Sequence, residues 1–269
     1  MVINGHELFY QTHGIAGGAA VVLLHHGLGS TRAWRRQVQP LVRAGFRVIA
    51  YDRWGYGKST ARPALGMPCF ADDQADLLAL LDRLEVEQAS LVGHSDGGTI
   101  ALYFAAAQPQ RVARLVTIAA HIYVEPMMPL SMLGIRQNYE NDGEFRQRFQ
   151  RAHGDKYPQV FENWYTGWLK PEHRSWDMRP ILRQISCPAL VIQGSKDEHA
   201  RPQHAVEIAA SVPGAELWIV PGAGHMLQRE AAKELNRKLV EFLRPQTDDD
   251  GRQSSEVRRP SSLTGEHHV

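Results

Sequence analysis

The sequence predicts an α/β fold, with a doubly wound, mostly parallel sheet and a small helical cap inserted between strands. Short apolar runs rich in β-branched residues recur along the chain, and helical patterns lie between most of them. The runs are continuous rather than alternating, as expected of parallel strands that helices cover on both faces. Alternation of strands and helices is typical of βαβ units in one sheet. A break in this alternation predicts the cap.

Each element of the fold is located by a local pattern. The expected strands are six continuous apolar runs, at residues 20–24, 46–50, 89–92, 115–119, 189–193 and 217–220. Leucines at positions 77, 80, 81 and 84 share one helical face, so we expect Asp76, Asp82 and Arg83 to face solvent. Another amphipathic helix has its apolar residues at positions 235, 239, 242 and 243. Asn4-Gly5 predicts a hairpin turn within residues 3–14.

The chain divides into a core in two parts, an insertion and a tail. We expect the core in residues 1–122 and 185–245, which hold the strand-like runs. Residues 123–184 have helical pieces and an aromatic cluster but no such run, which predicts a helical cap over the carboxyl edge of the sheet. Residues 246–269 are rich in Gln, Asp, Ser, Arg and Gly, and they bury too little apolar surface to offset the entropy of ordering. A flexible tail is therefore expected.

Composition narrows the class of protein. The formal net charge is +1 and the pI is about 7.9, without a dense Lys/Arg block, so neither nucleic acid nor an anionic membrane is an expected partner. No apolar run approaches the ~20 residues that cross a bilayer, and the N-terminus does not resemble a signal peptide. The two cysteines suggest no disulfide framework. We expect a cytoplasmic protein that acts on a small molecule, and the oligomeric state stays open.

Residues 91–102 carry the strongest chemical signal. A strand end runs into Gly93-His94-Ser95-Asp96-Gly97 and then into an Ala-rich helix start. This order is typical of a nucleophile elbow, a strained strand-to-helix turn that exposes a serine hydroxyl. Small residues two before and two after the serine avoid clashes in the turn. The pattern predicts Ser95 as the nucleophile, because an Asp96 nucleophile would place the bulky His94 at a small-residue position.

A serine that attacks a carbonyl group needs backbone N–H groups to hold the oxyanion. The strand at 20–24 runs into His26-Gly27-Leu28-Gly29, where glycines on both sides of Leu28 allow its amide to approach a ligand. In this architecture the loop after that strand supplies one amide, and the residue after the nucleophile supplies the other. We therefore assign the oxyanion hole to Leu28 and Asp96.

The acid and the base should follow the serine in that order. After the strand at 189–193 comes Gly194-Ser195-Lys196-Asp197-Glu198, which places an acid at the same sheet edge as the elbow. Asp197 is preferred because it lies closer to the strand; Glu198 and Glu125 are the alternatives. His225 is the predicted base, since it lies in a Gly-rich loop after the last strand. Three further histidines are expected at the surface or in the cap: His121, His199 and His204.

Together these motifs resemble the α/β-hydrolase superfamily over residues 5–243. The matching segments are 26–29, 52–59, the elbow, 194–197 and 224–225. Within the superfamily, segments 93–98, 119–124 and 185–192 are similar to the valacyclovir-hydrolase-like branch. In that branch the acid after the nucleophile can face the amine of an aminoacyl ester, so the resemblance implies Asp96 as a substrate-binding residue. The alternative is that its carboxylate only stabilises the first helical turn.

The predicted activity is hydrolysis of a small carboxylic ester through an acyl-enzyme, without a metal or cofactor. Trp164 and Tyr123 are expected to bind substrate beside Asp96. Two alternatives stay open: carbon–carbon bond hydrolysis of a vinylogous diketone or cofactor-free perhydrolysis on the same fold, and a non-catalytic ligand receptor. A dicarboxylate substrate would need convergent arginines, and four lie in the expected cap: Arg136, Arg146, Arg148 and Arg151.

Overall fold

Seven strands form one sheet in the order β3-β5-β4-β6-β7-β8-β9 in a computed structural model that describes residues 1–244. The strands are β3 (Tyr10–His13), β4 (Ala20–Leu24), β5 (Arg47–Tyr51), β6 (Ala89–His94), β7 (Val112–Ile118), β8 (Ala189–Gly194) and β9 (Glu216–Val220). All neighbours pair in parallel except β3 and β5. The predicted doubly wound sheet is confirmed, since the chain builds outward from β4 in both directions.

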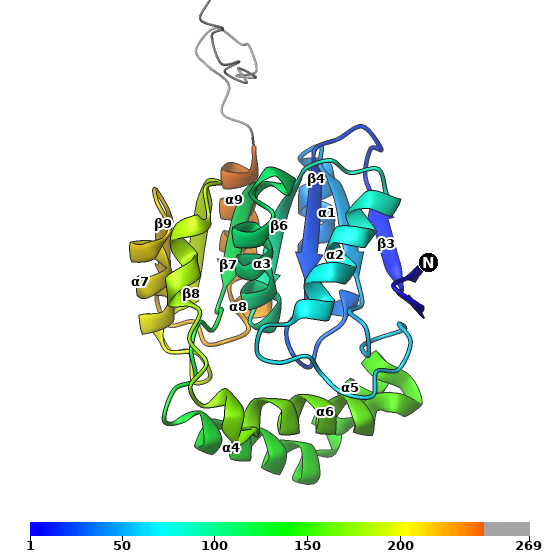
Figure 1. Cartoon of the computed structure of the whole chain (residues 1–269), viewed down its shortest axis with the longest axis vertical. Coiled ribbons are helices and arrows are strands. Elements are labelled where there is room, and N and C mark those ends of the chain that lie inside the picture. Colours follow the sequence, from blue (N-terminus) through cyan, green and yellow to red (C-terminus); the bar gives the residue numbers. More distant parts are fainter. Residues whose placement is uncertain (245–269) are drawn as a thin grey trace, which may run out of the picture.

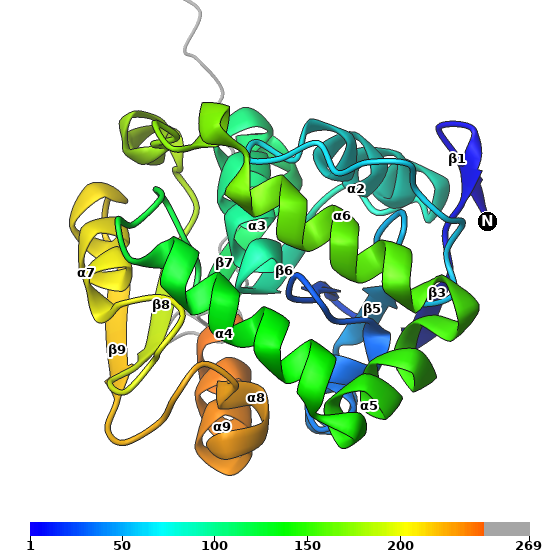
Figure 2. The same cartoon turned by 90° about the horizontal axis from the view of Figure 1, so that it is seen from below.

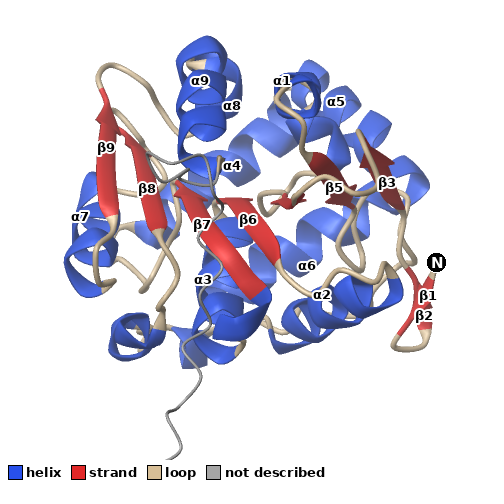
Figure 3. Ribbon diagram, turned by 90° about the horizontal axis from the view of Figure 1, so that it is seen from above, coloured by secondary structure: helices blue, strands red, loops and turns tan. Residues whose placement is uncertain are grey.

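The helices lie on both faces of this twisted sheet, with α1, α8 and α9 on one side and α2, α3 and α7 on the other (Figure 3). Their bounds are α1 (Val38–Arg43), α2 (Ala71–Arg83), α3 (Asp96–Ala107), α7 (Pro202–Ser211), α8 (Leu227–Glu230) and α9 (Ala232–Leu243). Successive strand residues point to opposite faces. Val21 and Leu23 accordingly pack in the cluster that contains Leu239, whereas Val22 and Leu24 pack in the cluster that contains Ile100.

Three further helices lie across one end of the sheet, where the parallel strands have their carboxyl ends (Figures 1 and 2). They are α4 (Met128–Asn141), α5 (Gly143–His153) and α6 (Tyr157–Leu169), called the cap helices below. The chain leaves the core after β7 and returns before β8, and these strands are neighbours. An isolated antiparallel bridge between Tyr123 and Asp177 joins the outgoing and returning segments. The cap helices thus close over the edge where the elbow lies.

The N-terminal segment differs in part from the expectation. The hairpin is present as β1 (Val2–Ile3) and β2 (His6–Glu7) around Asn4 and Gly5, both at positive φ. The chain then continues into β3, which joins the main sheet as an antiparallel edge strand. The expectation that Asp76 faces solvent is wrong: it is buried, because His6 Nε2 lies 2.8 Å from its Oδ2 and Asn4 donates to its Oδ1 at 2.9 Å.

The predicted flexible tail, residues 246–269, lies outside the described residues. Among the helices described, none has the length and apolar character needed to cross a membrane.

Candidate active site

Ser95 occupies the turn between β6 and α3. Its backbone has φ 54° and ψ −123°, a region that costs a non-glycine residue about 1–3 kcal/mol. The turn is tight enough to require glycine on both sides: a Cβ at Gly93 would lie 2.2 Å from the Gly97 carbonyl oxygen, and one at Gly97 would lie 2.2 Å from the Leu24 carbonyl oxygen. The elbow geometry expected from the sequence is therefore present at Ser95.

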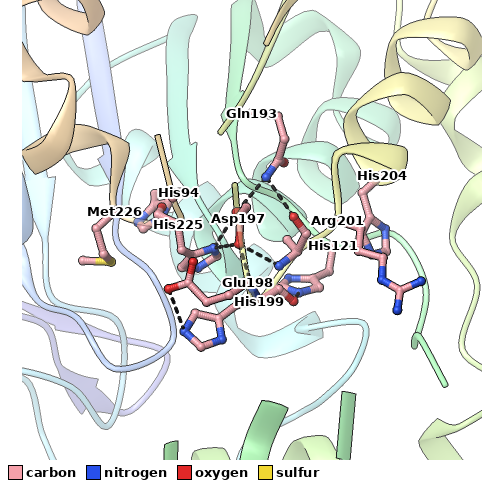
Figure 4. A network of polar contacts seen from close by, with 12 residues as sticks. His94, His121, Gln193, Asp197, Glu198, His199, Arg201, His204, His225 and Met226 are labelled. Atoms are coloured by element: carbon pink, nitrogen blue, oxygen red, sulfur yellow. Dashed lines mark hydrogen bonds and ion pairs between the residues drawn. The ribbon is translucent and has the colours of Figure 1, made fainter. Parts of the chain in front are cut away.

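His225 and Asp197 meet beside this turn. His225 Nδ1 lies 2.9 Å from Asp197 Oδ2 and 3.1 Å from Oδ1 (Figure 4). Both residues are buried, and His225 lines the same cavity as Ser95. The side-chain hydrogen bonds of His225 within residues 1–244 use Nδ1, so Nε2 remains for a proton from the serine.

Asp197 is held as an anion by its neighbours. Its Oδ1 accepts from the amides of His199 (2.8 Å) and Ala200 (2.9 Å), and its Oδ2 accepts from Gln193 Nε2 at 2.6 Å. Burial by itself raises the pKa of a carboxyl group, but the bonds from His225 and from these amides outweigh it and hold the Asp197 pKa well below its usual range. An ionised Asp197 fixes the Nδ1–H tautomer of His225, the form in which Nε2 can accept a proton.

Two backbone amides are available beside the serine. Leu28 lies in the loop after β4, and Asp96 is the first residue of α3. Within the described chain neither amide N–H donates a backbone hydrogen bond, and both residues line the cavity with Ser95. Unpaired N–H groups at this point could hold a carbonyl oxygen as it becomes negative.

His94 connects the elbow with the His225 loop. Its Nε2 donates to the His225 carbonyl oxygen at 2.9 Å, and its Nδ1 accepts from Gln228 Nε2 at 3.1 Å. Burial, together with the nearby His225, lowers the pKa of His94 to about 3, so the ring stays neutral. Gln228 is held in turn by Gln37, whose Nε2 donates to the Gln228 carbonyl oxygen at 3.1 Å.

The Asp96 side chain belongs to a buried network of charges. Its Oδ2 accepts from Trp164 Nε1 at 3.1 Å and lies 3.7 Å from Arg53 Nη2. Arg53 also pairs with Asp73 at 3.1 Å, and Arg62 pairs with Asp73 at 2.9 Å. Burial raises the pKa of Asp96, and the Arg53 charge opposes that rise. The carboxylate therefore has a cationic partner within the protein.

A cavity of about 350 Å³ lies between the sheet edge and the cap helices, a size suited to a small molecule. Its core side includes His26, Gly27, Leu28, Ser95, Asp96 and His225. Its other wall is mostly apolar and comes from the cap helices: Met128, Met132, Ile135, Phe149, Trp164 and Trp168. Within residues 1–244, no group of three or more His, Cys, Asp or Glu side chains is arranged to hold a metal.

The cavity separates the sequence predictions for substrate binding. Asp96 and Trp164 line it, whereas Tyr123 is not among the residues that line it. Tyr123 lies at the Tyr123–Asp177 bridge, where its hydroxyl donates to Glu207 at 3.3 Å and Arg179 lies 4.9 Å from its ring centroid.

Of the three histidines assigned to the surface or the cap, His121 and His204 are instead buried, and His121 lines the cavity. His199 is half-exposed, lines the cavity and packs edge-on against His225 with ring centroids 5.2 Å apart. His204 Nε2 lies 2.8 Å from Glu125 Oε1, and Arg201 also pairs with Glu125. The other alternative acid, Glu198, lies 3.6 Å from His199 Nε2, so the carboxylate that pairs with His225 is that of Asp197.

Several residues of the site were not singled out in the sequence. Gln193 and His94 are polar residues at the ends of apolar strand runs, which is the one signal that could have identified them. Gln228 and Gln37 carry no comparable signal, since their partners lie far along the chain.

Comparison with known proteins assigns the family. Residues 20–180 match the family described as the alpha/beta hydrolase fold. This chain is an α/β hydrolase.

Relatives of this α/β hydrolase include several named enzymes. The serine hydrolase BPHL of Homo sapiens is 32% identical over 249 residues, which cover 90% of this chain and 85% of that protein. The 2-hydroxy-6-oxo-6-phenylhexa-2,4-dienoate hydrolase of Burkholderia cepacia is 28% identical over 260 residues, covering 84% and 88%. The crystal structure of a hydrolase from Pseudomonas aeruginosa PA01 has a TM-score of 0.74 at 27% identity and covers 89% of this chain and 95% of its own.

Proposed function

We propose that this α/β hydrolase is a serine hydrolase that cleaves small carboxylic esters through an acyl-enzyme. Ser95 Oγ attacks the ester carbonyl and gives its proton to His225 Nε2, while the Leu28 and Asp96 amides hold the oxyanion. The proton passes to the leaving alcohol. Water, deprotonated by His225, then attacks the acyl group and regenerates Ser95.

The observation that carries this proposal is the convergence of three groups on one cavity. The cavity is lined by the strained Ser95, by His225, whose imidazole pairs with the buried Asp197 carboxylate, and by Leu28 and Asp96. Within the described chain the amide N–H groups of these last two residues have no backbone partner. The mostly apolar wall from the cap helices suits an acyl chain or an alcohol, and the cavity volume suits a small ester.

The test combines covalent labelling with turnover. A fluorophosphonate probe should modify the wild type at one serine and leave Ser95→Ala unmodified. The same variant should remain folded yet lose essentially all hydrolysis of a p-nitrophenyl ester, because one hydroxyl group at the turn contributes little packing. Labelling of a folded Ser95→Ala protein, or a tenth of wild-type turnover, would exclude Ser95 as the nucleophile.

Whether aminoacyl esters are preferred depends on the Asp96 side chain. Asp96→Asn keeps the amide N–H, so simple esters should change by a few-fold at most. A charge-assisted bond to a substrate ammonium is worth roughly 1.5–3 kcal/mol, or on the order of ten- to a hundred-fold in kcat/KM. The measurement is the ratio of losses on matched esters with and without an α-amine. Equal losses on the two esters would show that the Asp96 carboxylate interacts with Arg53 and Trp164 and not with a substrate amine.

Carbon–carbon bond hydrolysis is the second candidate, and one observation favours it. Arg148 lines the cavity, although it also pairs with the exposed Glu144 at 3.2 Å, and Arg229 from α8 lines it too. Of the other candidate arginines, Arg136 forms a two-bond pair with Glu162 and Arg146 donates to main-chain carbonyl groups. A 2-hydroxy-6-oxo-dienoate substrate, which is a vinylogous diketone, carries a carboxylate that Arg148 and Arg229 could bind. Turnover of such a diketone faster than of esters, with a loss in Arg229→Gln, would replace the ester assignment.

A further inference from the structure

His153, the last residue of α5, joins a cap helix to two loops of the core. Its Nε2 lies 3.2 Å from the Leu28 carbonyl oxygen, and its Nδ1 lies 2.9 Å from the amide nitrogen of Gly57. The side chain is buried, at 2% exposure, and its ring packs on Phe149 with centroids 4.4 Å apart. A single imidazole therefore bridges three segments of the chain.

The two contacts define the proton on this ring. An amide N–H can only donate, so Nδ1 must accept from Gly57 and carries no hydrogen. A carbonyl oxygen can only accept, so Nε2 carries the hydrogen and donates to Leu28. Burial lowers the pKa of His153 to about 4, which keeps this neutral tautomer at neutral pH. Both bonds are made at once by one protonation state.

The Leu28 loop has few other anchors. At its start, His25 donates from Nδ1 to the His26 carbonyl oxygen at 2.8 Å, since its Nε2 accepts from the Arg53 amide. At its end, Asp52 accepts from the Thr31 amide at 2.6 Å. Between these points, the bond from His153 is the one side-chain hydrogen bond to the loop backbone within residues 1–244. A backbone turn bond from the Gly29 amide to the His26 carbonyl oxygen at 2.9 Å closes the same stretch, and the bond from His153 adds a tether from the cap side.

We propose that His153 is a positioning residue, and that docking of the cap helices completes the oxyanion hole. This inference rests on the proposed ester hydrolysis. The Leu28 carbonyl and the Leu28 amide flank the same Cα, so a bond that fixes the carbonyl also restricts the direction of the N–H. The second oxyanion residue has a cap contact as well, because Trp164 donates to the Asp96 carboxylate. The cap helices therefore touch both residues that supply the amides.

The experiment compares four variants of the full chain on a neutral p-nitrophenyl ester. His153→Phe keeps an aromatic ring but removes both polar contacts. His153→Gln can place an N–H donor where Nε2 lies and so keep the bond to Leu28, whereas the shorter His153→Asn can reach only Gly57. His173→Phe is the matched control, because His173 is another buried histidine of the inserted segment and its ring bonds to the Gly167 carbonyl oxygen at 2.7 Å.

We expect His153→Phe and His153→Asn to lower kcat by about ten-fold or more with KM nearly unchanged, since the oxyanion forms only in the transition state. Removal of an oxyanion donor costs about 10²–10³-fold, which is the upper limit for a displaced one. Affinity for a trifluoromethyl ketone, whose adduct with serine carries an oxyanion, should fall by the same factor. His153→Gln should stay within about three-fold of wild type, and His173→Phe should behave likewise.

The proposal is overturned if His153→Phe and His173→Phe lose activity equally, or if the loss lies in KM with trifluoromethyl ketone affinity unchanged. If His153→Phe does not fold, the kcat values of His153→Gln and His153→Asn are compared with each other. Equal kcat values would refute the positioning role of His153. A wild-type protein without ester turnover would instead contradict the proposed function, which separates the two failures.

Discussion

Replacement of His94 by glutamine should change how the stability of the protein depends on pH. The His94 pKa is about 3 in the folded protein, against about 6.5 for an unperturbed histidine. His94 therefore stays neutral in the folded protein at pH values at which it binds a proton in the unfolded chain. As a result, the free energy of unfolding decreases as pH falls from 6.5 towards 3. Between pH 7.5 and 4.5 this one group should lower the free energy of unfolding by roughly 2–3 kcal/mol. A folded pKa of 4 would give nearly the same figure.

Glutamine removes the titrating group but can still donate to the His225 carbonyl oxygen. The free energy of unfolding of wild type and His94→Gln should be measured by urea titration at several pH values from 7.5 to 4.5. Titrating groups that do not interact with His94 cancel in the difference between the two proteins. The variant should be less stable than wild type at pH 7.5, because it loses the tight packing of His94. This deficit should shrink by roughly 2–3 kcal/mol at pH 4.5. A deficit that stays constant over this range would show that His94 is not held neutral by burial.

Three further perturbations test the site and its surroundings. Asp197→Asn should leave the fold intact but lower kcat by roughly 10³–10⁴-fold, because the amide no longer fixes the His225 tautomer; a loss under ten-fold in ester turnover would exclude Asp197 as the orienting acid. Gly27→Ala places a Cβ 2.0 Å from Trp164 Nε1 and 2.7 Å from Asp96 Oδ2, so it should displace the indole, and a crystal structure with Trp164 unmoved would contradict this. Burial raises the pKa of Cys187 to about 11, so Ellman's reagent should titrate Cys69 alone in the native protein, and a second fast thiol would argue against the packing around β8.

The sheet and the elbow could be predicted from the sequence because their signals are local. Six apolar runs are continuous within the chain, and the elbow is a short sequence pattern. Gly93 is required by a contact inside the turn, with the Gly97 carbonyl oxygen, although Gly97 is required by the close approach of β4 at Leu24. β3 was missed because an edge strand exposed on one side carries no apolar run; its four residues are half-buried or exposed.

The polar interior could not be predicted, because its partners are distant in the chain. Asp76 sits on the expected polar face of α2, yet it is buried by His6 and Asn4, about seventy residues away. His204 likewise lies on a helix that looks surface-exposed, and its position is set by Glu125. The spacing of apolar residues along a helix does not predict such pairs, because a polar side chain can be buried where a hydrogen-bond partner is available.

The attachment of the inserted segment has a consequence for the diversification of this architecture. β7 and β8 are neighbours in the sheet, and the Tyr123–Asp177 bridge joins the segments that lead into and out of the insertion. The insertion therefore begins and ends at nearly the same place, and its length does not affect the register of the sheet. We expect that such a segment can be exchanged between homologues by recombination at two breakpoints that lie close together in space. We expect a chimeric enzyme with a transplanted insertion to fold but to hydrolyse its substrate slowly, unless the insertion also supplies a hydrogen-bond donor for the Leu28 carbonyl. Compatibility in chimeras should therefore follow that one contact more closely than overall sequence identity.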